Sequence, residues 1–564
     1  MSGRSTSFEI HVLKDKRWVL TEIVGDEANA VEFADSLLNK SNYDAVRVVR
    51  DFKRLDGMHS ETVIHEKVSV AQKADISLVP VSDTPMCETL ADVYALPSRL
   101  VIGRLFRRYL DDVVLTPTEL LHNARELKRL SDKGRLLMSA VDQIAALQAP
   151  GGGEEARQRR DLLHKGWDQL FARARKATPD KPVKFKTFKE LSAAAEETPD
   201  DADFQRLVWM SAQLLDQRGW IAKLDKVLAW TGEEGGEAGM ALFDGLIADL
   251  LIPAQAVQDL LGYQPNLGNA LCHLCDLVEG KAEPAKFASE SFAAINRLFA
   301  DGRLPQSREA VLYRIARELK SVNLLCRNEP DQEYETFVRV LNRLVTLSGV
   351  IGGDVMAEAL LHRSIRQQNM GGVSGALYAV DEILAILGDG CRCTLFLLDL
   401  AAIPHTDPEF APGLAQCFAT LARERQHIDR WVPQRLPPRE RMTAVTACNR
   451  AIQASQVLSD ALKAQLAGRT DQVLAAYLEE GKVIEKIDNP DDPLAFRALR
   501  LVKFCSSGVL IAGKSLDMAH QRVLNHLRQP QFEAKFLASI PDPAQAERHL
   551  REFHRLLVES GFGS

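Results

Sequence analysis

The sequence predicts a mainly α-helical protein in which a small N-terminal α/β module, ordered strand–strand–helix–strand–strand (ββαββ), precedes a large multi-helix body. Apolar residues alternate with polar ones in stretches before Val68, as in strands, whereas beyond Pro97 they recur at three- and four-residue steps, as in helices. Aromatic residues make up only 6% of the chain, while Ala, Leu, Glu and Arg are abundant, which favours helix. The body is expected to form helical bundles or a short irregular solenoid.

The N-terminal module is predicted to contain two strand pairs and one helix. The predicted strands are Phe8–Leu13, Trp18–Val24, Ala45–Phe52 and Thr62–Val68, and Asp26 is predicted to cap a helix that runs through Lys40. A sheet of this size needs its one helix, or another domain, to cover its apolar face.

The chain of 564 residues is too long for one hydrophobic core, so roughly two to four domains are expected. Capping residues followed by proline mark helix starts, as at Thr116-Pro117 and Asp542-Pro543, and Gly- and Pro-rich stretches divide the body. The predicted segments are the α/β module at 1–72, an extended connector at 73–98, a helical segment at 99–176, a basic and polar linker at 177–200, the main helical domain at 201–431, a Pro-rich linker at 432–441 and a C-terminal helical domain at 442–564.

Charge and composition argue against several classes of protein. The 70 Lys and Arg residues against 77 Asp and Glu residues give a net charge of -7, which provides no overall attraction to nucleic acid or to an anionic membrane. The longest apolar runs, such as Thr394–Ile403, are far shorter than the roughly 20 residues of a membrane span, and the N-terminus has no signal-peptide pattern. Nine scattered cysteines argue against a disulfide framework. We expect a cytoplasmic protein with no transmembrane segment and no cofactor.

The stretch Gly508–Ser515, "GVLIAGKS", matches the phosphate-loop pattern, in which Gly508, Gly513, Lys514 and Ser515 would hold a nucleotide. Four apolar residues occupy its variable positions, and apolar residues continue at helical spacing on both sides. We therefore predict a continuous structural helix here, with small residues packed against a neighbouring helix. A nucleotide site is the alternative.

Two cysteine pairs are candidate metal or redox sites. Cys272 and Cys275 lie in "LCHLCDL", and Cys391 and Cys393 lie just before "TLFLLDL". Both runs have helical apolar spacing, and a buried free cysteine behaves as a small apolar side chain, so core packing is the preferred interpretation. The two runs align through Asp276 and Asp399, which leaves open an internal repeat or a coincidence.

A basic amphipathic helix is predicted at Ser98–Asp112. Arg99, Arg104, Arg107 and Arg108 would lie near one face of this helix and form a partner-binding surface or a peripheral membrane contact. This binding surface is the alternative, and the preferred interpretation is an ordinary domain helix with a solvated basic face. A second basic stretch, Phe171–Glu190, mixes lysine and arginine with phenylalanine but belongs to no recognised nucleic-acid-binding fold.

These patterns favour a non-enzymatic interaction or regulatory protein of bacterial type, a scaffold or adaptor that binds protein partners through helical surfaces. The sequence shows no zinc-protease or serine-hydrolase motif. Two alternatives remain: an enzyme whose site is assembled only in three dimensions, and a nucleotide-binding regulator that uses Gly508–Ser515. The oligomeric state stays open.

Overall fold

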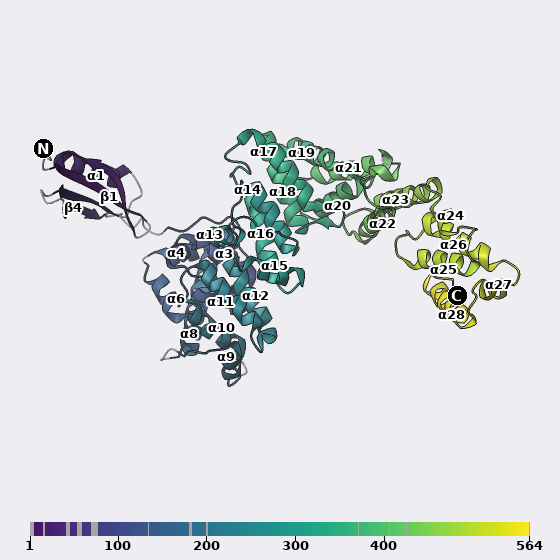
Figure 1. Cartoon of the computed structure of the whole chain (residues 1–564), viewed down its shortest axis with the longest axis horizontal. Helices are drawn as coiled ribbons and strands as arrows, with labels where there is room; N and C mark the ends of the chain where they lie inside the picture. The colour runs from purple at the N-terminus through teal and green to yellow at the C-terminus, as the bar shows by residue number, and fades with distance from the viewer. Residues whose placement is uncertain are drawn as a thin grey trace. The chain divides into compact units, whose positions relative to one another are not determined.

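The computed structural model describes all residues except 1–4, 15–16, 41–44, 54–58, 69–76, 134, 180–182, 199–200, 370, 405–406, 425 and 563–564. The chain divides into two compact units. The first holds Met1–Thr84, Arg104–Val113 and Lys128–His164, and the second holds Pro85–Gly103, Val114–Leu127 and Lys165–Ser564. The predicted fold class is confirmed, because a small antiparallel sheet with one helix precedes a body built almost entirely of helices (Figure 1).

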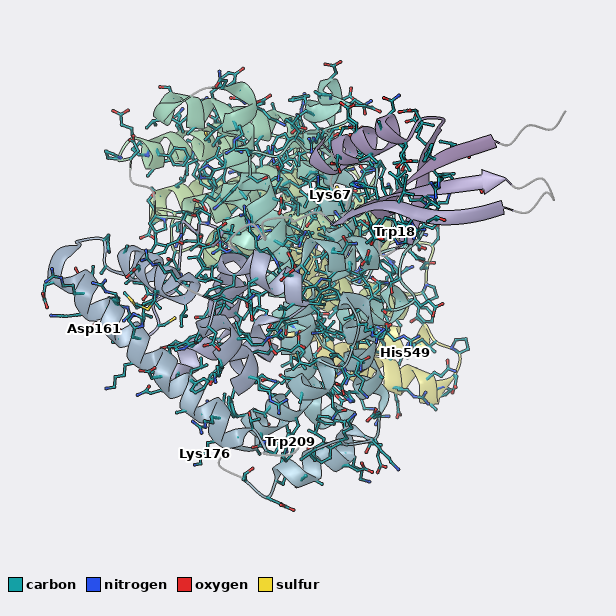
Figure 2. All side chains as sticks on the ribbon, turned by 90° about the vertical axis from the view of Figure 1, so that its left-hand side faces the viewer. Trp18, Lys67, Asp161, Lys176, Trp209 and His549 are labelled. Carbon is teal, nitrogen blue, oxygen red and sulfur yellow. The ribbon has the colours of Figure 1, made fainter. Side chains whose placement is uncertain are left out.

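The N-terminal module has the predicted ββαββ order. Its elements are β1 (Ser5–Lys14), β2 (Arg17–Val24), α1 (Glu27–Lys40), β3 (Ala45–Lys53) and β4 (His59–Val68). The strands form one antiparallel sheet in the order β2-β1-β3-β4, so β2 and β4 are its edges in the described part of the chain. Trp18 lies on the edge strand β2 and Lys67 on the opposite edge strand β4 (Figure 2).

Helix α1 covers one face of the sheet. Alternate side chains of β1, Phe8, Ile10 and Val12, are buried against Ala30 and Ala34 of α1. This is the period-two pattern of a strand packed against the apolar stripe of a helix. The other face of the sheet is not covered by α1.

The rest of the first unit is helical. It contains α4 (Arg107–Val113), α7 (Leu136–Gln148), the last part of α6 (Ala124–Ser131) and the first part of α8 (Gly153–Ala177). The predicted connector begins at 73–76, outside the described residues, and has no helix or strand from 77 to 89. Helices α2 (Leu90–Tyr94) and α3 (Leu96–Leu105) begin within its predicted range.

The second unit is built from short and medium helices. Besides α2 and α3 it contains α5 (Pro117–Leu121), α9 (Phe188–Ala195), α10 (Ala202–Leu214), α11 (Trp220–Gly232), α12 (Met240–Leu250), α13 (Ala254–Leu261), α14 (Leu267–Val278), α15 (Phe292–Ala300), α16 (Pro305–Lys320), α17 (Glu333–Leu344), α18 (Gly353–Gln368), α19 (Gly372–Leu387), α20 (Gly390–Ala401), α21 (Phe410–Glu424), α22 (Pro438–Ala454), α23 (Asp460–Glu480), α24 (Val483–Ile487), α25 (Leu494–Ser506), α26 (Lys514–Leu527), α27 (Phe532–Ala538) and α28 (Pro543–Glu559). A two-residue hairpin, β5 (Val345–Thr346) with β6 (Gly349–Val350), follows α17.

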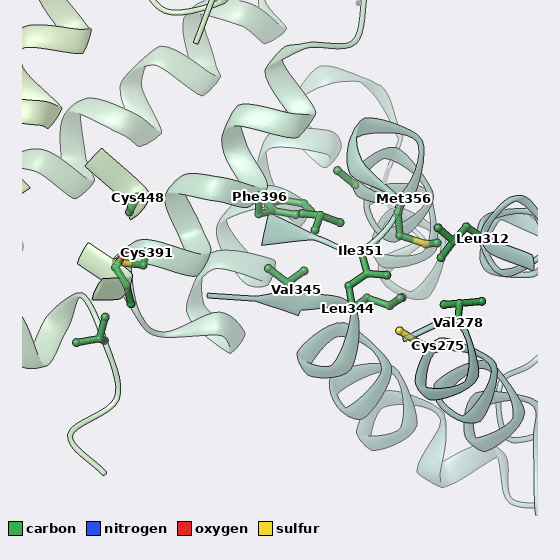
Figure 3. Close-up of a cluster of buried hydrophobic side chains, with 14 of the residues drawn as sticks. Cys275, Val278, Leu312, Leu344, Val345, Ile351, Met356, Cys391, Phe396 and Cys448 are labelled. Atoms are coloured by element: carbon green, nitrogen blue, oxygen red, sulfur yellow. The ribbon is translucent and has the colours of Figure 1, made fainter. Parts of the chain in front are cut away.

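Many of these helices contact one another in two rows. In one row α12, α16, α18, α20 and α22 touch in succession, and in the other α14, α17, α19, α21 and α23 do so. The order of the labels along the body in Figure 1 follows these rows. A large apolar core runs through the unit from Phe188 to Leu556, and Figure 3 shows part of it around Leu344, Ile351 and Phe396. This arrangement is that of a short irregular solenoid.

Two segments that were predicted to be linkers contain residues of the helical body and its core. Helix α9 lies inside the range predicted as a linker at 177–200. Val432, the first residue of the predicted Pro-rich linker, is fully buried in the common core, as is Trp431, the last residue of the predicted main helical domain. The two aligned sequence runs fall on α14 and α20, which lie in different rows, so they do not occupy equivalent places in a structural repeat.

Gly280 makes a close backbone contact that no other residue can make. Its φ of +68° is left-handed, and a Cβ there would lie 2.5 Å from the backbone nitrogen of Ala300. We expect Gly280→Ala to destabilise the protein by about 2–4 kcal/mol, because left-handed strain adds to a clash with backbone that cannot move aside. Urea unfolding followed by circular dichroism measures this loss.

Gly302 provides the matched control. Its φ is +67°, but a Cβ there would meet no atom within 4 Å. Gly302→Ala should therefore cost only the conformational strain, about 1–2 kcal/mol. Equal losses in the two variants would contradict the importance of the Gly280–Ala300 contact.

Candidate functional site

The stretch Gly508–Ser515 is not a continuous helix, so that prediction is wrong. Helix α25 ends at Ser506, the residues from 507 to 513 form a loop, and α26 begins at Lys514. The loop side chains Val509, Leu510 and Ile511 are buried in the core. The apolar residues whose spacing predicted a helix are buried, as a core helix would require, but they belong to a loop.

The start of α26 has a carboxylate where a phosphate loop would hold its anion. The backbone N–H groups of Lys514 and Ser515 donate to Asp471 of α23 at 2.6 and 2.9 Å. The Ser515 hydroxyl donates to the carbonyl of Ile511 at 3.1 Å, and Lys514 Nζ lies 3.7 Å from Glu479. A negative charge at a helix N-terminus is stabilising. A phosphate would therefore have to displace the Asp471 carboxylate, and the element before the loop is a helix rather than a strand.

The candidate cysteines lie in two separate helices. Cys272 and Cys275 are on α14, and burial raises their pKa values to about 11 and about 12. Cys391 and Cys393 are on α20 and fully buried, and Figure 3 shows Cys275 and Cys391 at different places in the core. Among the described residues, no three His, Cys, Asp or Glu side chains are grouped to hold a metal ion. Raised thiol pKa values disfavour the thiolate that metal binding and redox chemistry use.

The predicted basic helix is broken at Phe106 into α3 and α4, so the prediction of one helix over Ser98–Asp112 is wrong. Each candidate arginine has a partner within the chain. Arg99 is buried, Arg104 lies 3.2 Å from Asp83, Arg107 donates to Asp111 at 2.8 Å and Arg108 donates to Ser77 at 2.6 Å. Arg99 belongs to the second unit and the other three to the first. Because Arg99 is buried, the four side chains do not form one basic surface.

In the described part of the chain, no single helix has both the length and the apolar composition of a membrane span. Two pairs of consecutive helices meet both criteria when each pair is counted as one segment, but each pair is sharply bent at the break between its helices.

A buried charge network surrounds α5, and no sequence pattern predicted it. Lys223 Nζ donates to Glu119 Oε1 at 2.6 Å, and the two side chains are 1% and 0% exposed. Arg99 Nη1 lies 3.1 Å from Asp249 Oδ1, and Asp249 also accepts the Thr118 N–H at 2.7 Å. Burial raises the pKa of the Glu119 carboxyl, and the attraction of Lys223 opposes this shift. These groups are buried, so their role is structural. Glu119 connects α5 to Lys223 of α11, and Thr118 connects α5 to Asp249 of α12.

A second buried charge lies in the C-terminal helices. Asp488 is 1% exposed and accepts hydrogen bonds from Arg497 Nε and His526 Nε2, both at 2.8 Å, and from Arg522. Burial alone would raise the pKa of this carboxyl, but the bonds from Arg497, His526 and Arg522 hold it below its usual value. A buried carboxylate with several donors is stable as the anion, so this group joins α25 and α26.

The surface of the second unit carries an exposed aromatic pair, Tyr263 and Phe287. Tyr263 follows α13 and is 63% exposed, and Phe287 lies between α14 and α15 and is 77% exposed. The Tyr263 N–H donates to the backbone carbonyl of Lys286 at 2.7 Å, so the two aromatic residues are neighbours across two loops. Aromatic side chains are the most common anchors of protein interfaces, and exposed ones of this size are unusual on a solvated surface.

The backbone fixes the aromatic pair in place. Phe287 has a φ of +65°, a left-handed conformation that is strained for a bulky side chain. At Gly262 a Cβ would lie 2.5 Å from the Lys286 carbonyl oxygen, so only glycine permits the close approach of the two loops. A second backbone bond, from Ser289 N–H to the Leu260 carbonyl at 3.2 Å, closes the arrangement. The strain at Phe287 is thus maintained by the surrounding contacts.

The charges beside the aromatic pair balance. Lys281 and Lys286 are exposed, as are Glu283 and Glu290. Lys286 Nζ lies 5.0 Å from the centre of the Phe287 ring, within cation–π distance. A surface with two charges of each sign has no attraction to a phosphate backbone or to an anionic bilayer, which leaves apolar contact as its main source of affinity.

The candidates predicted from the sequence are thus dispersed over the molecule. The aromatic pair was not predicted, although both residues lie where helical periodicity stops: Tyr263 directly follows a glycine and Phe287 follows Pro284 by three residues. Comparison of the chain with protein-family models, with curated protein sequences and with solved structures finds no match.

Proposed function

We propose that the protein is a non-enzymatic cytoplasmic scaffold or adaptor that binds a protein partner through its helical body. The observation that carries this proposal is the aromatic pair, which offers two large exposed rings in a strained backbone conformation. A rigid aromatic anchor loses little conformational entropy when it enters a partner's pocket, so it gives high affinity for its area. The two rows of helices support the proposal as well, because stacked helices form extended binding surfaces.

A photo-crosslinking experiment tests the proposal. A benzophenone amino acid is placed at Phe287 in one version of the full chain and at Tyr378 in another, and both are irradiated in cells. Tyr378 lies on α19, is also an exposed aromatic residue at 54%, and therefore reports non-specific collisions. We expect a discrete protein adduct from position 287 that position 378 does not give. The same adducts from both positions, or none from either, would count against the proposal.

Phe287→Gly separates binding from stability. Glycine adopts the left-handed conformation without strain, so the variant should keep the melting temperature of the parent protein or exceed it slightly. Loss of the ring should weaken binding to the crosslinked partner by about 2 kcal/mol or more, which corresponds to roughly 30-fold in Kd. Calorimetric titration measures the affinity, with Tyr378→Ala as the control that leaves it unchanged. An unaltered Kd for Phe287→Gly would rule out the aromatic pair as the anchor.

A further inference from the structure

Strand β2 is an edge strand with few charged residues to oppose pairing with another strand. Both edge strands contain a β-bulge, at Thr21 in β2 and at Ile64 in β4, so the bulges do not distinguish the two edges. The described residues from Val19 to Ile23 are all exposed, and three of them are large and apolar: Val19 at 49%, Leu20 at 47% and Ile23 at 54%. The sequence of the opposite edge, β4, contains five ionisable residues, His59, Glu61, His65, Glu66 and Lys67, whereas that of β2 contains only Arg17 and Glu22. Charged residues on an edge strand oppose pairing with another strand, so β4 is better protected than β2.

The apolar side chains of β2 point to both faces of the sheet. Val19 pairs with Val12, whose side chain faces α1, whereas Leu20 pairs with His11 and Ile23 with Glu9, which face the uncovered side. A partner packed on one face would leave the apolar side chains of the other face in water. A strand added beside β2 places side chains next to those of β2 on both faces and also satisfies the backbone groups of the edge.

The charges along the chain indicate which strand this is. Within β2 the basic residue Arg17 stands at the start and the acidic residue Glu22 stands near the end, and the acidic residues Asp26 and Glu27 follow the strand. A second copy of β2, aligned antiparallel about a two-fold axis, sets the basic start of each strand beside the acidic end of the other. We infer that the protein forms a homodimer through antiparallel β2–β2′ pairing, which joins the two sheets into one continuous sheet.

The inference goes beyond partner binding and does not depend on it, because β2 belongs to the first unit and the aromatic pair to the second. A two-fold interface of this kind is closed, since each β2 edge is used once. Pairing of β2 with β4 of another copy would instead propagate into a filament, and the charged β4 edge opposes it.

Sedimentation equilibrium of the full chain tests the inference. The parent protein should show a concentration-dependent monomer–dimer equilibrium that weakens as salt is raised. Leu20→Lys should weaken dimerisation by at least about ten-fold, because it places like charges on the two paired strands. The matched control is Val63→Lys on β4, which has the same 47% exposure and should leave the dimer unchanged. Circular dichroism confirms that both variants keep the fold.

A second variant separates charge from apolar contact. Glu22→Lys removes one of the acidic residues at the end of β2, so it should weaken the dimer at low salt and have little effect at high salt. A parent protein that is monomeric at all concentrations would overturn the inference. Equal weakening by Leu20→Lys and Val63→Lys, or larger open-ended assemblies in place of a dimer, would overturn it as well.

Discussion

Lys223→Met is expected to destabilise the helical body by about 3–5 kcal/mol, because it leaves the Glu119 carboxylate buried without its cation. The two side chains are 1% and 0% exposed, so water cannot replace the lost partner. The Lys223 ammonium also donates to the Val114 carbonyl at 2.6 Å, and that acceptor loses its donor too. Urea unfolding of the full chain at pH 8 measures the loss.

The double variant Lys223→Met with Glu119→Gln is the matched control. Glutamine keeps an acceptor for the Thr116 N–H, which donates to Glu119 at 2.9 Å in the cap of α5, but carries no charge. Most of the lost stability should return. If the single and double variants are equally unstable, the ion pair is not the source of the effect.

The single variant should also be less impaired at pH 5.5 than at pH 8. Burial already raises the pKa of the Glu119 carboxyl, and removal of Lys223 takes away the attraction that opposes this shift. A carboxyl with a raised pKa in the folded state keeps a proton that the unfolded state releases, so stability falls as pH rises toward the folded pKa. A loss independent of pH would contradict this mechanism.

Asp488→Asn is expected to cost about 2–3 kcal/mol, since a neutral amide replaces the anion that accepts from Arg497, His526 and Arg522. The melting temperature of the full chain measures the effect. Asp491→Asn, an exposed acid of the same sequence stretch, is the control and should change little.

The pH dependence of the Asp488 variant has a definite sign. The folded-state pKa of Asp488 is lowered, so its contribution is fully present above the unfolded pKa of about 3.9 and is lost as pH falls through the folded pKa. The difference between parent and variant should therefore be constant near neutral pH and shrink below about pH 4. A difference that grows on acidification would contradict the assignment.

Local pattern predicts the N-terminal module well and the region around Gly508 poorly. In β1 the alternation of Phe8, Ile10 and Val12 has one interpretation, because a single helix covers a single face of the sheet. In the C-terminal body the apolar residues Val509 to Ile511 fit helical spacing, yet they belong to a buried loop. The periodicity of apolar residues indicates which side chains are buried, not which backbone conformation they have. In this stretch only the glycines at 508 and 513 indicated that the helix is interrupted.

Local sequence patterns do not predict the buried charge networks or the exposed aromatic pair. Glu119 and Lys223 are 104 positions apart, and neither has a sequence neighbour that reveals the other. The arginines from 99 to 108 look alike in sequence, but Arg99 is buried and Arg108 is held near the surface. Exposure of Phe287 depends on the backbone contact with Gly262, which only the folded chain shows.

The two rows of helices have a consequence for how the body comes apart. A helix in the middle of a row contacts the helix before it and the helix after it, whereas α27 and α28, beyond the rows at the C-terminal end of the body, contact α25 and each other. Opening from an end breaks one set of contacts at a time, whereas opening in the middle breaks two. The body should therefore unfold locally from its ends. The backbone amides of the terminal helices should exchange with solvent faster than those of α16 and α18.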